Sequence, residues 1–135
     1  MTREELCKTA VSAMKNAYAP YSNYKVGAAL LCKDGTVYTG CNVENASYGI
    51  TCCAERTAFF KAVSDGKKEF TEIAVCGGKN GNLESEIFSP CGVCRQVMRE
   101  FCDDGFLIDM IYDGGIKSCT LQEILPYSFK PERLK

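Results

Sequence analysis

The sequence contains no histidine. This absence excludes every mechanism in which an imidazole acts as base or metal ligand, including the Ser-His and Cys-His pairs of hydrolases. A group that moves protons near neutral pH must therefore be a carboxylate, a thiol, a lysine, a tyrosine or a water molecule activated by a metal.

Excess charge and long apolar runs are also missing. The chain has 16 basic and 17 acidic residues, a formal net charge of −1, and no basic run that would attract nucleic acid. No stretch approaches the roughly 20 apolar residues of a membrane span. The first residues, Met1–Glu5, are polar and acidic, and no apolar signal region follows them. We therefore expect a cytoplasmic protein without a nucleic-acid or membrane partner.

The size of the chain is typical of one domain. Its 135 residues predict a single domain over residues 1–135, and 46% hydrophobic residues suffice for an ordinary core. Neither internal repeats nor linker-like segments interrupt it.

Cysteine is abundant, with ten residues. A secreted disulfide scaffold is one interpretation of a short cysteine-rich chain, but the length, the core composition and the missing signal region favour reduced thiols. Six cysteines fall inside helix or strand patterns, where a reduced thiol behaves as a small apolar residue: Cys7, Cys32, Cys41, Cys76, Cys102 and Cys119. The other four lie in two short motifs.

These motifs are Thr51-Cys52-Cys53-Ala54-Glu55-Arg56 and Ser89-Pro90-Cys91-Gly92-Val93-Cys94. Together they offer three thiolates, at Cys53, Cys91 and Cys94, and one carboxylate, Glu55, that need not bind a metal. A structural zinc usually closes its fourth position with another Cys or His, so this set suits a catalytic zinc with one open position. Cys52 is a possible alternative to Cys53, or a fourth ligand that would close the site.

Helix starts are predicted at both motifs. Ser89 followed by Pro90 is typical of an N-cap and first helical residue, and Thr51 is an N-cap candidate for a second helix. The cysteines would then lie in the first turns, where the partial positive charge of a helix N-terminus favours thiolates. Zinc held between the two helix starts would make hydroxide available near neutral pH. Arg56 could offset the excess negative charge of three thiolates by donating to sulfur.

The remaining pattern predicts an α/β protein with a mixed sheet. Capping boxes begin helices at Thr2 and Thr120. Asp34-Gly35 predicts a hairpin between strands 24–32 and 36–43. Further strands are expected at residues 72–78 and 107–112, with room for a short final strand after Gly114-Gly115. The two helices that carry the cysteines follow strands, so their N-termini should meet at one edge of the sheet.

Zinc-dependent deaminases carry a Cys-x-Glu or His-x-Glu element followed by Pro-Cys-x-x-Cys. Cys53-Ala54-Glu55 and the segment 90–94 match both elements, and this register favours Cys53 over Cys52 as the ligand. Over nearly its whole length the chain resembles the small homotetrameric cytidine deaminases of nucleoside salvage. The resemblance implies a three-layer α-β-α fold with a mixed central sheet, one zinc per subunit and a homotetramer.

The resemblance also implies the reaction, which is hydrolytic deamination of cytidine and 2′-deoxycytidine to uridine and 2′-deoxyuridine. Glu55 would carry the protons. The resemblance further implies substrate contacts at these positions: Asn42 and Glu44 to the ribose hydroxyls, Tyr24 and Val26 to the pyrimidine, backbone at Ala54 and Ser89 to the base edge, and Phe129 to the site of a neighbouring subunit. The family usually has Phe where this chain has Tyr24.

Three alternatives remain open. Blasticidin-S deaminases share both zinc elements, and Asn42 and Glu44 favour a ribose-bearing nucleoside over blasticidin. A structural-zinc interaction domain would unfold without metal and would not need Glu55. A dithiol redox protein using Cys91 and Cys94 would bind no metal and form a disulfide.

Overall fold

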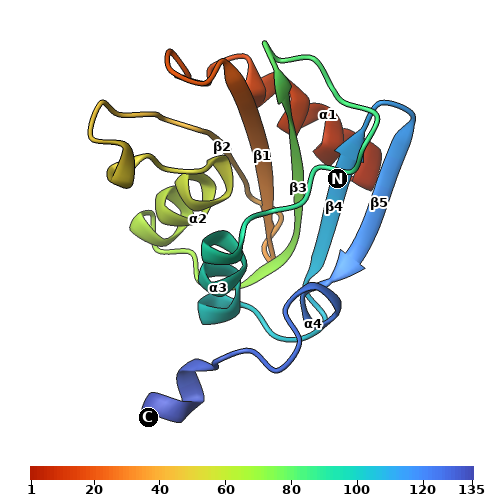
Figure 1. Cartoon of the computed structure of the whole chain (residues 1–135). Helices are drawn as coiled ribbons and strands as arrows, with labels where there is room; N and C mark the ends of the chain where they lie inside the picture. The colour runs from red at the N-terminus through yellow and green to blue at the C-terminus, as the bar shows by residue number, and fades with distance from the viewer.

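The computed structural model describes all 135 residues and consists of a five-stranded sheet covered by helices (Figure 1). The helices are α1 (Arg3–Met14), α2 (Ala54–Ser64), α3 (Gly92–Phe101) and α4 (Leu121–Ile124), with short 3-10 helices at Tyr48–Ile50 and Pro131–Leu134. The strands are β1 (Tyr24–Cys32), β2 (Val37–Cys41), β3 (Phe70–Lys79), β4 (Leu107–Tyr112) and β5 (Gly115–Thr120). None of the helices has both the length and the apolar character that a membrane crossing requires.

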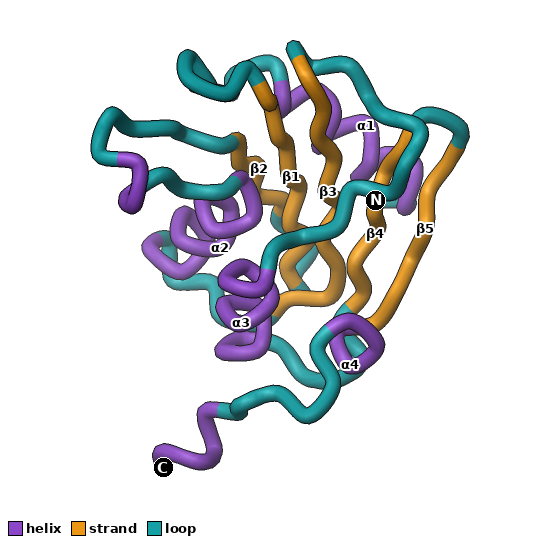
Figure 2. The backbone as a smooth tube through the Cα atoms, in the orientation of Figure 1, coloured by secondary structure: helices purple, strands orange, loops and turns teal.

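The sheet is mixed, as the sequence predicted. Its strand order is β2-β1-β3-β4-β5 (Figure 2). Strands β3 and β4 are parallel, and every other neighbouring pair is antiparallel. The predicted Asp34-Gly35 hairpin joins β1 to β2, with Leu31 opposite Val37. Gly35 has a φ of 93°, the left-handed conformation that favours glycine in such turns.

Side-chain caps define two of the helix starts. The Thr2 hydroxyl accepts a hydrogen bond from the backbone N–H of Glu5 at 3.2 Å and so begins α1. At α4 both bonds of the predicted capping box are present, because Thr120 caps Glu123 and the Glu123 carboxylate accepts from the Thr120 N–H. These helices begin where the sequence predicts.

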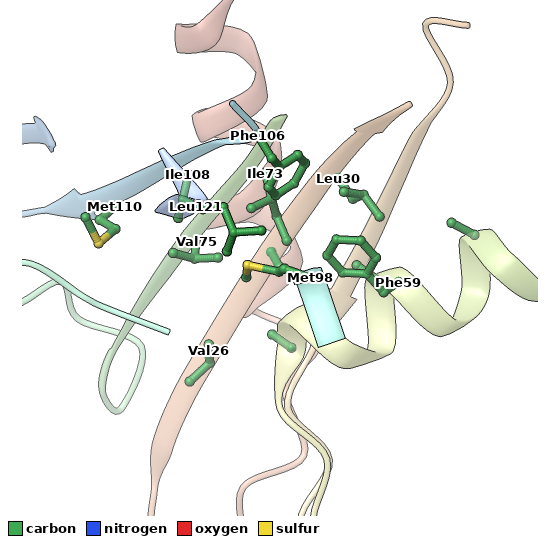
Figure 3. Packing of buried hydrophobic residues seen from close by; sticks show 14 residues of the cluster. Val26, Leu30, Phe59, Ile73, Val75, Met98, Phe106, Ile108, Met110 and Leu121 are labelled. Atoms are coloured by element: carbon green, nitrogen blue, oxygen red, sulfur yellow. The ribbon is translucent and has the colours of Figure 1, made fainter. Parts of the chain in front are cut away.

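Helices cover both faces of the sheet, which gives the expected three layers. Alternating residues of β1 point to opposite faces, so Ala28 and Leu30 pack under α2 and α3 while Ala29 packs under α1. The larger cluster centres on Phe59 of α2, whose ring lies against the sheet near Met98 of α3 (Figure 3). Burial of such a side chain contributes about 1.5–3 kcal/mol.

Two glycines allow α1 and α2 to approach the sheet closely. A Cβ at Gly27 of β1 would lie 2.2 Å from the carbonyl oxygen of Ala10 in α1. A Cβ at Gly40 of β2 would lie 2.2 Å from the carbonyl oxygen of Ala54 in α2. Both distances are far below an ordinary contact, so each position requires a residue without a side chain.

Candidate metal centre and active site

Three thiols meet at the N-terminal ends of α2 and α3. The sulfur atoms of Cys53, Cys91 and Cys94 all lie within 4.8 Å of one another. The Sγ–Sγ distance is 3.9 Å from Cys53 to Cys91 and 3.5 Å from Cys91 to Cys94. Tetrahedral zinc with Zn–S bonds of about 2.3 Å requires sulfur atoms roughly 3.8 Å apart. The three thiols therefore fit one zinc ion, and they meet at one edge of the sheet as predicted.

The helices begin later than the sequence predicted, because two cysteines are themselves the N-caps. Cys53 precedes α2 and Cys91 precedes α3, in extended backbone. The carbonyl of Cys53 accepts from Thr57 N–H at 3.1 Å, which closes the first turn of α2. The predicted N-caps, Thr51 and Ser89, are therefore wrong.

The hydroxyls of Thr51 and Ser89 have other partners. Thr51 Oγ1 accepts from the backbone N–H of Asn45 at 3.2 Å, and Ser89 Oγ accepts from Arg95 Nη2 at 2.5 Å. As a result neither hydroxyl caps a helix. Both cysteine side chains also leave the first helical N–H groups without a side-chain cap, so the positive ends of α2 and α3 point at the thiols.

Arg56 lies against the sulfur cluster. Its Nη2 donates to Cys53 Sγ at 3.3 Å, and the same nitrogen reaches the Thr51 carbonyl at 3.5 Å. The pKa of the Cys53 thiol is lowered to about 5, mainly by a hydrogen bond from Cys94 and, to a smaller extent, by the hydrogen bond from Arg56. The pKa of Cys94 is raised, first by its hydrogen bond to Cys53 and then by burial.

Glu55 occupies the first turn of α2, two residues after Cys53. Its side chain is only 2% exposed, and its Oε1 has no hydrogen-bond partner in the protein. Burial is the main cause that raises the pKa of this carboxyl to about 7, and the neighbouring Cys53 thiolate adds to the rise. A buried carboxyl with one oxygen left without a partner, next to a metal-binding cluster, is typical of a group that exchanges protons with a substrate.

Cys52 is not part of the cluster. It forms an antiparallel bridge with Val43, and its Sγ accepts a weak hydrogen bond from Thr57 Oγ1 at 3.7 Å. The Cys52 thiol therefore contacts Thr57 of α2 and does not belong to the group of three sulfur atoms, and the structure supports the register that uses Cys53.

Asn42 and Glu44, the expected ribose contacts, are both buried after the end of β2. Asn42 Oδ1 accepts from Val26 N–H at 2.9 Å, and its Nδ2 donates to the Tyr24 carbonyl at 2.8 Å. These two bonds use one donor and one acceptor of the amide, and a second of each stays available.

Glu44 organises the turn before β1. Its Oε1 accepts from the N–H groups of Tyr21 and Ser22, at 3.0 and 3.1 Å, and its Oε2 accepts from the Ser22 hydroxyl. The hydroxyl, followed by the two N–H groups, lowers the pKa of Glu44. An ionised carboxylate is thus held at this end of the sheet.

Tyr24 and Val26, which the sequence predicts to contact the pyrimidine, lie on β1. Val26 is buried in the larger core cluster, which also includes Ala54. The Tyr24 ring stacks on Phe88, with centroids 6.4 Å apart, and its hydroxyl donates to Glu84. Burial and this bond raise the pKa of Tyr24 to about 12. The hydroxyl that distinguishes Tyr24 from the usual Phe therefore has a partner in the loop after β3.

Phe129 is not packed into this site. Its side chain is 57% exposed, and it lies in a tail that projects from the body of the protein (Figure 1). Gln96 of α3 donates to the Phe129 carbonyl at 2.8 Å and anchors the start of that tail.

Ser22, Glu84 and Arg95 contact the proposed site residues, and none of them was predicted from the sequence. Arg95 could have been suspected, because it lies four residues after Cys91 and so on the same helix face. Glu84 had no local signal, since its partner Tyr24 is 60 residues away.

Comparisons with known proteins agree with this geometry. Residues 1–110 match the sequence profile of the cytidine and deoxycytidylate deaminase zinc-binding region. The chain is 47% identical over 135 residues to a cytidine deaminase of Sporosarcina psychrophila, covering 99% of this chain and 96% of the relative. A blasticidin-S deaminase of Bacillus cereus is 32% identical over 129 residues, covering 93% and 90%.

Among solved structures, the crystal structure of cytidine deaminase from Burkholderia pseudomallei superposes with a TM-score of 0.88. The two chains are 45% identical, and the match covers 96% of this chain and 100% of the other. The profile match, the relatives and the three-thiol cluster agree with one another. The chain belongs to the cytidine and deoxycytidylate deaminase family and has that family's zinc-binding region.

Proposed function

We propose that this protein catalyses the hydrolytic deamination of cytidine and 2′-deoxycytidine, which yields uridine or 2′-deoxyuridine and ammonia. The observation that carries the proposal is the buried carboxyl of Glu55, whose Oε1 has no hydrogen-bond partner, beside a cluster of three thiols. Full-length similarity to a protein named cytidine deaminase supports the substrate. Free nucleosides need no basic surface, in agreement with the net charge of −1.

In this proposal Cys53, Cys91 and Cys94 are the zinc ligands, and Arg56 offsets their excess negative charge by donating to Cys53. Bound zinc supplies an activated water by lowering the pKa of that water to near neutral. The donor set agrees with this role, because three protein ligands leave one coordination position open.

Glu55 acts as the proton carrier. Its carboxylate accepts a proton from the attacking water and donates it to ring nitrogen N3, which makes C4 electron-poor. Oxygen then bonds to C4. Glu55 takes the second proton from the resulting C4 hydroxyl and passes it to the amino group; the C4–N bond breaks, ammonia leaves, and the C4 carbonyl of the product forms. A pKa near 7 lets the carboxyl both accept and donate a proton close to neutral pH.

The proposal also assigns the substrate contacts. Asn42 and Glu44 bind the ribose hydroxyls, since Asn42 keeps a free donor and acceptor and Glu44 is ionised at the end of β2. Tyr24 and Val26 line the pyrimidine side, and backbone at Ala54 and Ser89 reads the base edge. Phe129 completes the site of a neighbouring subunit, which agrees with its exposure.

Assembly and location are part of the proposal. We expect residues 1–135 to act as one domain and to form a homotetramer. Exposed apolar side chains around the 3-10 helix and α2 support an interface there: Tyr48, Ile50 and Phe60. Ten free cysteines support a reducing compartment, and we propose the cytoplasm.

Blasticidin S is the second candidate substrate, because one relative with 32% identity is named a blasticidin-S deaminase. The higher identity to proteins named cytidine deaminase favours cytidine.

The test is to follow the ultraviolet absorbance of cytidine with the wild-type protein and with Glu55→Gln, and to assay zinc in both. We expect only the wild type to consume cytidine, with comparable zinc in the two proteins. If the wild type binds zinc but leaves cytidine unchanged, the substrate is wrong and blasticidin S is tested next. Absence of zinc from protein purified without chelator would contradict the three-thiolate site.

A further inference from the structure

The segment between β3 and the metal-binding end of α3 makes few hydrogen bonds, although the Phe88 ring stacks on Tyr24 and the Pro90 side chain is buried. Residues 83–91 form no helix or strand. Near its start, Glu84 is bonded to Asp113 N–H and to the Tyr24 hydroxyl. From Ser89 to Cys91, every hydrogen bond other than the thiol contacts comes from one residue, Arg95.

Arg95 uses its whole guanidinium group for this purpose. Its Nε donates to the Pro90 carbonyl at 2.7 Å, and its Nη2 donates to Ser89 Oγ at 2.5 Å. The remaining nitrogen, Nη1, donates to the Ile124 carbonyl at the end of α4, at 2.5 Å. In addition, the backbone N–H of Arg95 donates to the Cys91 carbonyl at 3.0 Å.

These bonds connect three parts of the protein. Arg95 itself belongs to α3, Ser89 and Pro90 belong to the segment that enters the metal centre, and Ile124 ends α4, which lies beside the lower part of the sheet in Figure 1. A planar guanidinium can serve three acceptors in fixed directions, whereas a lysine ammonium cannot match that arrangement. The Arg95 side chain therefore connects the backbone immediately before Cys91 to the end of α4 by hydrogen bonds.

The position of that backbone matters for two reasons. Cys91 is the N-cap of α3 and contributes one of the three sulfur atoms, so a displaced Pro90–Cys91 peptide would move a metal ligand. Ser89 is the proposed base-reading position, and the two bonds from Arg95 are the only hydrogen bonds made to Ser89 and Pro90, although packing also buries the Pro90 side chain.

We propose that Arg95 is a positioning residue, which holds the segment Ser89–Cys91 in register for both the zinc ion and the nucleoside base. This inference rests on the proposed function, since it assigns the base-reading role to Ser89. The rival explanation is purely structural: Arg95 would only attach α4 to α3, and its loss would lower stability without a local effect on the site.

The experiment compares the zinc-loaded wild type with Arg95→Lys and with a matched control, Arg133→Lys. Lysine preserves the positive charge, but it cannot donate hydrogen bonds to all three acceptors in the geometry of the guanidinium group. Arg133 is exposed in the tail and makes no side-chain hydrogen bond or ion pair in this chain, so its replacement controls for the loss of a guanidinium. Three quantities are measured: kcat and KM for cytidine, the rate of zinc transfer to a chelator, and amide hydrogen exchange of peptides covering residues 84–94.

For Arg95→Lys we expect a rise in KM and a fall in kcat/KM of about 10–100-fold, the range typical for residues that orient metal ligands. We also expect faster zinc transfer and faster exchange in residues 84–94, with exchange elsewhere unchanged. Adding Ser89→Ala to Arg95→Lys should change little more, because Ser89 Oγ has already lost its donor. Arg133→Lys should resemble the wild type in all three measurements.

Two outcomes would overturn the inference. One is unchanged local exchange and zinc transfer in Arg95→Lys. The other is an unchanged KM with kcat reduced only in proportion to the folded fraction, which is the structural explanation. If the wild type does not deaminate cytidine, the proposed function fails, and exchange and zinc transfer still decide whether Arg95 positions the segment.

Discussion

The contact between β2 and α2 offers a sharp test of how the fold positions the site. Gly40→Ala adds a Cβ that would lie 2.2 Å from the carbonyl oxygen of Ala54 and 2.7 Å from the N–H nitrogen of Ala58. Both atoms belong to the backbone of α2 and cannot rotate away. The helix must therefore move outward, and it carries Glu55 in its first turn and Cys53 as its N-cap.

The size of the movement follows from the contact distances. Ordinary van der Waals contacts of a Cβ begin near 3.4 Å, so α2 must shift by about 1 Å or β2 must deform by the same amount. Overpacking of this kind typically costs about 1–3 kcal/mol of stability. A displacement of about 1 Å in a catalytic group can reduce the rate by about 100-fold. We therefore expect the loss of activity to exceed what the loss of stability explains.

The matched control is Gly27→Ala on the opposite face of the sheet. Its Cβ would lie at the same distance, 2.2 Å, from the carbonyl oxygen of Ala10 in α1, which carries none of the proposed site residues. Thermal unfolding gives the stability of each variant, and cytidine turnover per zinc-loaded folded protein gives its specific activity. We expect similar destabilisation of both variants, with a large loss of specific activity only for Gly40→Ala.

Wild-type specific activity in Gly40→Ala would refute this reasoning, and so would equal losses in both variants. Wild-type activity would mean that the geometry of the site does not depend on the packing of α2 against β2, and equal losses would mean that the loss is not specific to α2.

Two further predictions concern the metal ligands and a buried carboxyl. Cys53→Ser should lose bound zinc while Cys52→Ser retains it, as measured by elemental analysis; zinc loss in Cys52→Ser alone would reverse the register. Burial and then a hydrogen bond with Glu72 raise the pKa of Asp109 to about 7, against the opposing effects of Ser118 and Arg3. The pKa of Asp109 in the folded protein lies above its ordinary value of 3.8. The protonated carboxyl therefore contributes fully to the free energy of unfolding below pH 3.8, and this contribution is lost as the pH rises through about 7. Asp109→Asn should reduce the pH dependence of the free energy of unfolding over this range, as measured by urea denaturation at a series of pH values. An unchanged pH dependence would contradict the assignment.

Much of the fold could be predicted because its signals are local. The bounds of β1 and β4 agree with the predicted strands, and the Asp34-Gly35 turn joins β1 to β2 as expected. The caps at Thr2 and Thr120 depend only on residues one helical turn away. Such features are visible in a short window of sequence.

The metal ligands were predictable for a different reason. Zinc is bound mainly by thiolates, imidazoles and carboxylates, and in a chain without histidine the paired cysteine motifs are the clearest donor set. The spacing of Cys53, Glu55, Cys91 and Cys94 then matched a known arrangement, although the two halves are 38 residues apart. The sequence therefore predicted which sulfur atoms meet, but it did not predict the path of the backbone between them.

The starts of α2 and α3 could not be predicted in the same way. Thr51 and Ser89 are good N-caps locally, yet each hydroxyl has a partner supplied by another part of the structure, Asn45 N–H and the Arg95 guanidinium. When such a partner takes the hydroxyl, the helix begins later, and here it begins after a cysteine. The effect brings each thiol to the positive end of its helix.

The amino-acid sequence by itself determined the hairpin, the strand pattern, the capped helices and the set of zinc-binding thiols, since these depend on local preference and ligand chemistry. Only the tertiary structure decided that Glu55 is buried with its Oε1 unpaired, that the Tyr24 hydroxyl donates to Glu84, and that Arg95 connects Ser89 and Pro90 to α4. Burial and contacts between distant segments arise from packing, which no short stretch of sequence contains.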